Sequence, residues 1–402
     1  MATRWPLEMG RPVRSSRATL AAAAGLAFAA SLVLPPTGAG AQTTYEIEAG
    51  RVFSRVSAES MRFLPSAIDV HRGDTLHFTS PSVHTATFLP VGEGVVDWFE
   101  ANAVLGSSGP YSLIRPDPDD GPTSFKFTNA AFFPTDNTCG GASQPACSFD
   151  GSSVLNSGLG VSDFSVDVDV APGNSFWVVC LIHGPPMRLT VNVVPNGQPA
   201  SDPADLAAAN AAAIQQDKNA SRALRNRFIE RRTSHTAPGG GRVWDAWAGV
   251  DAAHVSVYGM FPGKLVVDKG DTVQWHFDSL VFEDHTVSIP VRVAEPIADF
   301  FEPFCDPDGD AGPGPDNPPD MPDPPFCNDP TEVELELHGR FTLPQGNGLF
   351  GGTYLETSGV LGANTVLGNA DWELKFTKRS PAGGFRYMCM IHTAMRGRVI
   401  VR

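Results

Sequence analysis

A short pattern of metal-binding side chains occurs twice in this chain, and the repetition constrains the fold more than any other feature. Residues 176–183 read FWVVCLIH and are followed by Met187, and residues 385–392 read FRYMCMIH and are followed by Met395. Each copy places a thiol, an imidazole and a thioether within eight residues of one another. We expect each copy to lie on a strand, a loop and the next strand.

The rest of the two halves repeats as well. The offset between matching positions stays between 197 and 209 residues. Because this offset is far longer than the repeat of a solenoid protein, the duplication predicts two domains, each with its own core. Five landmarks recur in the same order: residues 72–75 as 269–272, His84 as His285, 97–100 as 299–302, 157–158 as 358–359, and 180–183 as 389–392.

Composition and local patterning favour β-structure in both halves. The chain has 40 Gly and 35 Pro among 402 residues, which suits a turn-rich chain better than a helical one. Residues 42–50 form a polar lead-in. From Tyr45 to about Pro195, and again in the second half, apolar and polar side chains alternate with the period of half-buried strands, which predicts an all-β fold. The predicted strands include residues 67–70, 75–78, 125–127, 164–168, 189–194, 264–267, 272–275, 372–376 and 398–401.

A single convincing helix is predicted between the two halves. Asp202 is a suitable N-cap and Pro203 suits the first helical position. No Gly or Pro interrupts the run from there to Arg232, and five arginines crowd its C-terminal part, where cations suit the helix dipole. We predict a helical linker packed on one or both domains, with a basic docking surface as the alternative.

The N-terminus has the layout of a secretory signal peptide. Basic residues precede an apolar run over residues 18–34, and small residues then form a cleavage site before Gln42. An uncleaved membrane anchor is the alternative, because the run is close to the shortest length that spans a bilayer. We predict export to the periplasm or the cell exterior, with no membrane span after cleavage. The predicted organisation is a signal peptide (1–41), a first domain (42–196), a helical linker (197–238) and a second domain (239–402).

The repeated pattern supplies the donors of a type 1, or blue, copper site. Such a site holds copper by two imidazoles and one thiolate, with a long axial thioether. The imidazole that each copy lacks is supplied by His84 or His285, which the duplication places at equivalent positions. Zinc is a lesser alternative, since it binds imidazole and thiolate without needing the thioether. We predict two type 1 copper ions per chain.

At these residues the chain resembles the cupredoxin family, in particular plastocyanin-like and amicyanin-like blue copper domains. The resemblance covers both halves apart from the linker and the long insertions. It implies two tandem Greek-key β-sandwich domains with one copper each. The implied ligands are His84, Cys180, His183 and Met187 in the first domain, and His285, Cys389, His392 and Met395 in the second.

Two departures from that family are visible in the sequence. The first histidine and the cysteine lie 96 residues apart in the first half and 104 in the second, which is longer than in small cupredoxins and implies inserted loops. The segment Gly184-Pro185-Pro186 also adds one residue before Met187 relative to the second copy. Since the axial ligand tunes the potential, the two sites are expected to differ.

Four of the six cysteines lie in two loops, where they can pair in an oxidising compartment. The two cysteines of the repeated pattern then remain as thiols, each close to a histidine. A disulfide between those two is the alternative. The expected pairs are Cys139–Cys147 and Cys305–Cys327, and the remaining thiols are Cys180 and Cys389.

The remaining histidines have no fixed spacing to a cysteine, so we expect core or surface roles for them. His77 and His276 fall on equivalent predicted strands. The acidic run 306–310 is expected to be a solvated loop, because it lacks the distal glutamate of an EF-hand calcium site.

The predicted function is electron transfer to or from a redox protein partner whose identity the sequence leaves open. The net charge of −15 argues against nucleic-acid partners. A copper oxidase or nitrite reductase would need a further catalytic copper cluster with His-x-His pairs and a His next to the type 1 Cys, and the sequence has neither. We therefore do not expect an enzyme. A copper carrier and a structural or binding module are the alternatives.

Overall fold

β-strands make up most of the described chain, in agreement with the alternating patterns of the sequence. The computed structural model describes residues 42–116, 125–136, 139, 146–160, 163–238, 240–252, 254–277, 283–298, 336–337, 342–362, 365 and 371–402. The predicted signal peptide, the predicted Cys305–Cys327 disulfide, the acidic run 306–310 and His338 lie outside these residues. Within the described ranges, no helix combines the length and the apolar character that crossing a membrane requires.

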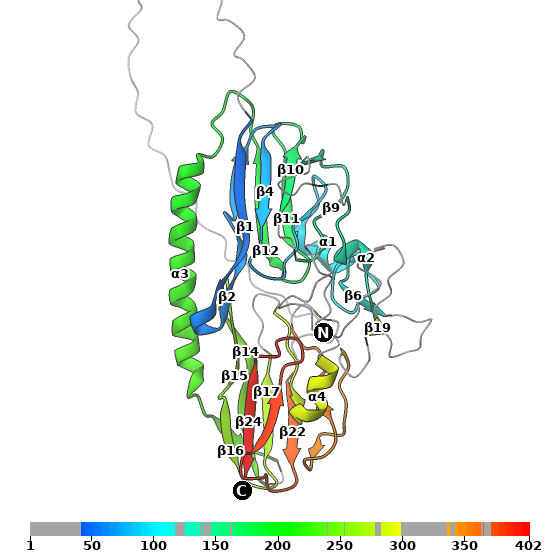
Figure 1. The fold of residues 1–402 in the computed structure, drawn as a ribbon, viewed down its shortest axis with the longest axis vertical. Coiled ribbons are helices and arrows are strands. Elements are labelled where there is room, and N and C mark those ends of the chain that lie inside the picture. The colour runs from blue at the N-terminus through cyan, green and yellow to red at the C-terminus, as the bar shows by residue number, and fades with distance from the viewer. Residues whose placement is uncertain are drawn as a thin grey trace, which may run out of the picture. The chain divides into compact units, whose positions relative to one another are not determined.

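The first half is a sandwich of two sheets (Figure 1). Its strands are β1 (Thr44–Phe53), β2 (Ala58–Leu64), β3 (Ala67–Val70), β4 (Thr75–Thr79), β5 (Thr87–Phe88), β8 (Cys147–Phe149), β9 (Leu155–Asn156), β10 (Phe164–Val168), β11 (Ser175–Cys180) and β12 (Gly184–Val193). One sheet has the order β2-β1-β4-β10-β8 and the other the order β3-β12-β11-β5-β9. Alternate side chains of both sheets, such as Ile47 and Val191, fill the core between them.

The second half repeats this arrangement. Its strands are β13 (Ser234–Thr236), β14 (Arg242–Ala252), β15 (Val255–Phe261), β16 (Lys264–Val267), β17 (Thr272–His276), β18 (Ser288–Ile289), β20 (Leu349–Phe350), β21 (Glu356–Thr357), β22 (Trp372–Phe376), β23 (Phe385–Met388) and β24 (Arg396–Val401). The order β15-β14-β17-β22 matches β2-β1-β4-β10, and β16-β24-β23-β18-β21 matches β3-β12-β11-β5-β9. The parallel pairs β1–β4 and β14–β17 are also equivalent. The strand order therefore confirms the duplication that the sequence predicts.

The two halves share one continuous sheet. Strand β2 pairs antiparallel with β15, and Glu59 lies opposite Ser256 in this pair. Each half thereby covers an edge strand of the other, which protects both edges from pairing elsewhere. Residues 42–402 accordingly form one unit of contacts. The domain boundaries at residues 196 and 238 remain predictions.

Helix α3 (Pro203–Ile229) lies between the halves in the sequence and packs against strands of both (Figure 1). The predicted N-cap is confirmed, since the Asp202 side chain accepts a hydrogen bond of 2.7 Å from the Ala204 N–H. Leu224 and Phe228 are buried against β14 and β15. Asp217, only 3% exposed, accepts a hydrogen bond of 2.6 Å from the Ser60 hydroxyl of β2.

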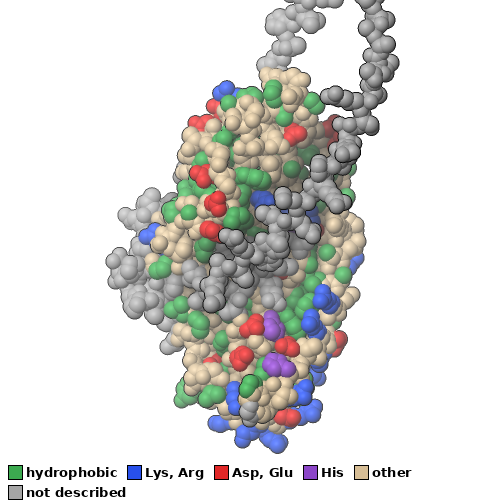
Figure 2. All heavy atoms as spheres, turned by 180° about the vertical axis from the view of Figure 1, so that it is seen from behind, with side chains coloured by type: hydrophobic (Ala, Val, Ile, Leu, Met, Phe, Trp, Pro, Cys, Tyr) green, Lys and Arg blue, Asp and Glu red, His purple; other side chains and the backbone are tan. Residues whose placement is uncertain are grey.

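Among the arginines in the C-terminal part of α3 and directly after it, one packs on an aromatic ring and others are exposed. Arg231 lies 4.6 Å above the ring of Trp247 in the second half, so its planar cation contributes to the packing of the helix. Arg222, Arg227 and Arg232 are exposed. Figure 2 shows basic side chains gathered over the half of the molecule that carries the C-terminus.

One expectation about local structure is confirmed and another is wrong. The β-structure predicted from Tyr45 onward is confirmed, since β1 begins at Thr44 within the polar lead-in, and Tyr45 and Ile47 point into the core while the polar residues beside them face outward. The prediction of a single convincing helix is wrong, because the described parts of the insertions contain three further α-helices. Their apolar side chains, such as Trp98 and Phe99, pack on the sandwich instead of pairing in a sheet. These helices are α1 (Val95–Asn102), α2 (Asn129–Phe132) and α4 (Val291–Ala298).

The insertions hold a small three-stranded sheet and a disulfide. Strand β7 (Phe125–Phe127) pairs with β6 (Ile114–Pro116) and with β19 (Glu336–Leu337), which belongs to the second half. The predicted Cys139–Cys147 disulfide is present. Cys180 and Cys389 are free and buried, so the alternative disulfide between them is not formed.

Candidate metal centres

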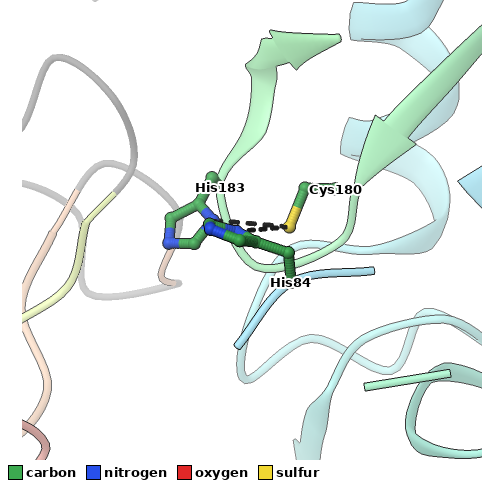
Figure 3. A group of neighbouring side chains, drawn as sticks. All are labelled: His84, Cys180 and His183. Carbon is green, nitrogen blue, oxygen red and sulfur yellow. Dashed lines mark hydrogen bonds between the residues drawn. The ribbon is translucent and has the colours of Figure 1, made fainter. Parts of the chain in front are cut away.

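The first predicted set of donors comes together at the end of strand β11. Cys180 ends that strand, His183 lies in the turn before β12, and His84 lies in the loop after β4. The Nδ1 atoms of His183 and His84 lie 3.3 Å and 3.8 Å from the Cys180 sulfur, and 3.0 Å from each other. All three side chains are buried (Figure 3).

The second set repeats this arrangement after strand β23. The Nδ1 atoms of His285 and His392 lie 3.2 Å apart, and the His392 Nδ1 lies 3.9 Å from the Cys389 sulfur. In each half, the three donor atoms lie within 4.8 Å of one another. The two histidine–cysteine–histidine groups that the sequence predicts are therefore both present.

A threonine after the first histidine holds each group together. The N–H of Thr85 donates to the Cys180 sulfur at 3.5 Å, and its hydroxyl oxygen accepts a bond of 2.8 Å from the Leu181 N–H. Thr286 makes the same two contacts in the second half, to the Cys389 sulfur at 3.3 Å and from the Met390 N–H at 2.7 Å. These bonds fix the histidine loop to the cysteine loop. They give a physical role to the His-Thr step that occurs in both halves.

The two methionines are buried in the same cores as the cysteines. Met187 lies within strand β12, whereas Met395 directly precedes β24. The difference arises because β12 already begins at Gly184, opposite Cys180. The axial role of both thioethers remains a prediction.

The electrostatics of each metal-free group favour a thiolate beside imidazolium. Burial by itself raises the pKa of the Cys180 thiol, but the charge of His183 and hydrogen bonds from both histidines hold that pKa well below its ordinary value. Burial lowers the pKa of His392, but Glu283 and the Cys389 thiolate raise it to about 10. A cysteine that is already ionised is ready to bind a metal, since the thiolate is the ligand form.

The donor set fits copper. Each group offers two imidazole Nδ1 atoms and one thiolate sulfur that converge on one small buried volume, with a thioether in the same core. Soft sulfur with imidazole is the ligand combination of type 1 copper. The two buried groups are therefore consistent with type 1 copper sites, in which copper would supply one-electron redox chemistry.

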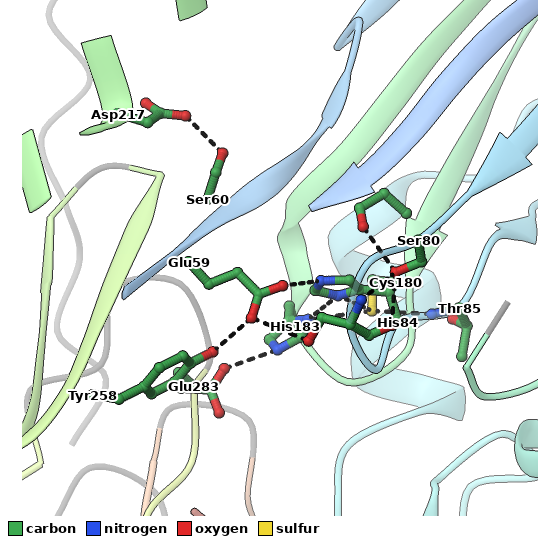
Figure 4. Close-up of polar contacts among 12 residues, drawn as sticks. Glu59, Ser60, Ser80, His84, Thr85, Cys180, His183, Asp217, Tyr258 and Glu283 are labelled. Carbon is green, nitrogen blue, oxygen red and sulfur yellow. Dashed lines mark hydrogen bonds and ion pairs between the residues drawn. The ribbon is translucent and has the colours of Figure 1, made fainter. Parts of the chain in front are cut away.

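Two buried glutamates, which no repeated pattern in the sequence indicates, contact histidines of the two groups, and Figure 4 shows both beside the first group. Glu59 of β2 accepts from the Nε2 of His84 at 2.8 Å. Glu283 accepts from the Nε2 of His183 at 2.9 Å and from the Nε2 of His392 at 3.0 Å. The position matching Glu283 in the first half is Ser82, so a comparison of the two halves could not find it. The signal that was available is its place two residues before His285.

Tyr258 of β15 completes the polar contacts between the groups. Its hydroxyl donates to Glu59 at 3.1 Å, and its ring stacks on His392 with 4.7 Å between the ring centres. Burial and the nearby carboxylates of Glu283 and Glu59 raise the pKa of Tyr258 well above its ordinary value, so the phenol keeps its proton.

A cavity of about 260 Å³ opens between the two groups. Polar side chains of both groups meet it, and the rest of its wall is mainly apolar. The apolar lining includes Leu105, Leu113, Ile114, Phe127, Ile182 and Ile391. His183 and His392 both line this cavity, and the Nε2 of His183 contacts Glu283 of the other half.

The chain is similar to solved copper proteins at low sequence identity. No protein-family profile and no curated protein sequence matches it, while 16 chains of solved structures do. Auracyanin A, a "blue" copper protein from the green thermophilic photosynthetic bacterium Chloroflexus aurantiacus, matches at 14% identity over 38% of this chain and 98% of its own, with a TM-score of 0.19.

Two nitrite reductases match a larger share of the chain. The Cu-containing nitrite reductase from Thermus scotoductus SA-01 matches at 13% identity over 90% of this chain and 68% of its own, with a TM-score of 0.19. The copper nitrite reductase from Nitrosomonas europaea matches at 12% identity over 90% and 94%, with a TM-score of 0.16. Because these scores are low, we take the assignment from the chain's own strand order and donor geometry. On that basis the fold is cupredoxin-like, with two type-1-like histidine–cysteine–histidine groups.

Proposed function

We propose that this chain is an electron-transfer protein with one type 1 copper centre in each of two Greek-key cupredoxin domains, which α3 joins. The observation that carries the proposal is the pair of buried histidine–cysteine–histidine groups, His84–Cys180–His183 and His285–Cys389–His392. A single such group could be a structural coincidence. Two groups with the same donors, the same threonine contacts and the same strand ends support a common chemical role.

The surroundings of the donors suit electron transfer. Each cysteine lies at or directly after a strand end, and its sulfur accepts from a backbone N–H of the histidine loop, so the fold itself fixes the position of the sulfur. A site with fixed donors changes little when the metal changes oxidation state, and this keeps the reorganisation energy small. The protein's contribution is thus to fix the donors and to exclude water from the sulfur.

A copper carrier and a structural or binding module remain the alternative functions. A carrier must pass its metal to a partner, and exposed sulfur ligands would help that exchange. Here both cysteines are 0% exposed. This burial favours retention of the metal over its delivery.

We also propose that the chain is not itself an oxidase or a nitrite reductase. Those reactions need a further copper cluster with several histidines, and the sequence has no His-x-His pair and no His-Cys step. Assays for nitrite reduction and for oxidation of phenols by the copper-loaded protein test this proposal directly. Turnover in either assay would contradict it.

The central test is copper loading followed by optical and EPR spectroscopy. We expect two coppers per chain, an intense thiolate-to-copper band and reversible one-electron reduction of both centres. Cys180→Ser and Cys389→Ser should each remove one centre and leave the fold intact. A colourless protein, or a copper-loaded protein that cannot be reduced reversibly, would overturn the electron-transfer proposal. Loss of copper to a mild chelator on reduction would favour the carrier.

Export and a redox protein partner are further proposals. The layout of residues 1–41 supports cleavage before Gln42 and release to the periplasm or exterior. N-terminal sequencing of the protein from those fractions should begin at Gln42. An intact N-terminus in a membrane fraction would instead support an anchor.

A further inference from the structure

One carboxylate contacts the imidazoles of both candidate centres. The Oε2 atom of Glu283 lies 2.9 Å from the Nε2 of His183, and the Oε1 atom lies 3.0 Å from the Nε2 of His392. Glu283 is 5% exposed, and it precedes strand β18 of the second half. Each oxygen therefore serves a different half of the chain. Figure 4 shows the contact between Glu283 and His183.

These contacts affect metal binding because a neutral imidazole carries hydrogen on one ring nitrogen and can bind a metal through the other. A carboxylate accepts a hydrogen bond only from a nitrogen that carries hydrogen, so Glu283 fixes the N–H at Nε2 in both rings. The Nδ1 atom of each ring is then directed at the cysteine sulfur of its own group. A carboxylate in this position also orients the ring and makes it a stronger ligand.

We propose that Glu283 is a positioning residue shared by the two metal centres, so that retention of metal in both halves depends on one carboxylate. This inference rests on the proposed metal sites, but it does not require that they transfer electrons. It assigns a physical link between the centres that the duplicated motifs do not contain.

The other buried carboxylate provides the contrast. Glu59 accepts from the Nε2 of only one ligand, His84, and its second oxygen accepts from the hydroxyls of Tyr258 and Ser82, each at 3.1 Å. It has the same charge and lies beside the same cavity. It therefore serves as a matched control for a carboxylate that acts on one centre alone.

His285, the fourth ligand histidine, makes the expected effect of losing Glu283 different at the two centres. The Nε2 of His285 is buried and has no hydrogen-bond partner among the described residues. Among the described residues, the histidines of the second centre thus have Glu283 as their carboxylate partner, whereas those of the first centre have Glu283 and Glu59. Loss of Glu283 should weaken both centres and should weaken the second one more.

The experiment measures each centre separately. In the Cys389→Ser background only the first centre can bind Cu(II), and in the Cys180→Ser background only the second. Glu283→Gln leaves one uncharged acceptor oxygen for two N–H donors, and it should lower Cu(II) affinity about 10–100-fold in both backgrounds, as loss of such partners does at other metal sites. Glu59→Gln should lower it in the first background only. Competition with a chelator gives the affinities.

A measurement on the metal-free protein keeps the test open if the variant folds poorly. In the wild type, ¹⁵N NMR should show N–H at Nε2 of both His183 and His392, each with a through-space contact to the side chain of Glu283. Absence of either contact would overturn the proposal. So would a Glu283→Gln effect confined to one background, or an equal effect of Glu59→Gln in both.

Failure of the proposed electron-transfer function gives different results from failure of the shared role of Glu283. If the wild type binds two Cu(II) ions but is not reversibly reduced, electron transfer fails and the shared positioning role stands. If the wild type is a reversible two-copper protein and Glu283→Gln leaves the affinity of either centre unchanged, the shared role fails and electron transfer stands.

Discussion

A β-carbon on Gly50 would lie 2.2 Å from the Nε2 atom of His84, closer than two non-bonded atoms can approach. Gly50 has a positive φ of 78° and marks a bulge where the register between β1 and β2 shifts. The missing side chain leaves the space that the imidazole of the first centre occupies. Gly50 therefore accounts both for the bulge in the sheet and for the position of the predicted ligand His84.

Replacement of Gly50 by alanine should remove metal from the first centre only. The methyl group would displace the His84 ring, and the positive φ would add strain of about 1–3 kcal/mol. We expect about one copper per chain instead of two, measured by metal analysis and EPR. Gly73→Ala is the control, because Gly73 also has a positive φ, of 95°, but a β-carbon there meets nothing within 4 Å. Two retained coppers in Gly50→Ala would show that the ring has room to move.

The equivalent glycine in the second half, Gly249, allows the same test on the second centre. A β-carbon on Gly249 would lie 2.1 Å from the Nε2 of His285, and the register between β14 and β15 shifts at this glycine. Gly249→Ala should therefore remove the second centre and leave the first. Gly270, with a φ of 100° and open space around its α-carbon, is the matched control. Loss of both centres in Gly249→Ala would mean that the halves unfold together.

The ligand groups could be predicted from the sequence because they repeat, whereas the contacts between them could not. Cys180 and Cys389 each lie three residues before a histidine, and the nearly constant offset between the halves leads to His84 and His285. Glu283 has no counterpart of its own kind, since Ser82 lies at the matching position. Its role depends on the pairing of β2 with β15, a contact between strands about 200 residues apart that follows from no local pattern.

In helix α3 as well, a feature set by neighbouring residues could be predicted from the sequence, whereas a contact with a distant strand could not. Its N-cap at Asp202 was predictable, because the preference of aspartate for that position is a property of a few neighbouring residues. The burial of Asp217 was not. That carboxylate accepts from Ser60 and forms an ion pair with Arg62, both on strand β2.

Removal of the Asp217 carboxylate should destabilise the protein without affecting the donors. The side chain of Asp217 is 4% exposed and that of Arg62 is 14% exposed. Loss of one partner leaves a buried charge uncompensated, which typically costs about 3–5 kcal/mol. Asp217→Ala should lower the free energy of unfolding by about that amount in urea titrations. Gln216→Ala, at the exposed neighbouring position of α3, should change it by less than about 0.5 kcal/mol. Equal effects of the two variants would exclude Asp217 as the anchor of the helix.

Two histidines outside the centres should make stability depend on pH. His77 lies 2.6 Å from Glu46 and 2.7 Å from Asp163, and in the second half His276 contacts Asp371 at 2.9 Å and Asp245 at 3.0 Å. Partial burial lowers the pKa of each imidazole, but the hydrogen bonds and charges of the carboxylates outweigh it and raise the pKa above the ordinary value. The folded state therefore binds protons more tightly than the unfolded chain at both positions.

The sign of the effect follows from this difference in pKa. The stabilisation is fully present below the unfolded pKa of about 6.5, and it is lost as the pH rises through the folded pKa. Replacing both histidines by glutamine should therefore lower the free energy of unfolding more at about pH 5.5 than at about pH 9. Urea unfolding of the metal-free wild type and of the double variant at both pH values gives this difference, and the titration of the metal-binding groups cancels because both proteins share it. A loss of stability that is equal at the two pH values would show that the contacts act as neutral hydrogen bonds, without charge on the imidazoles.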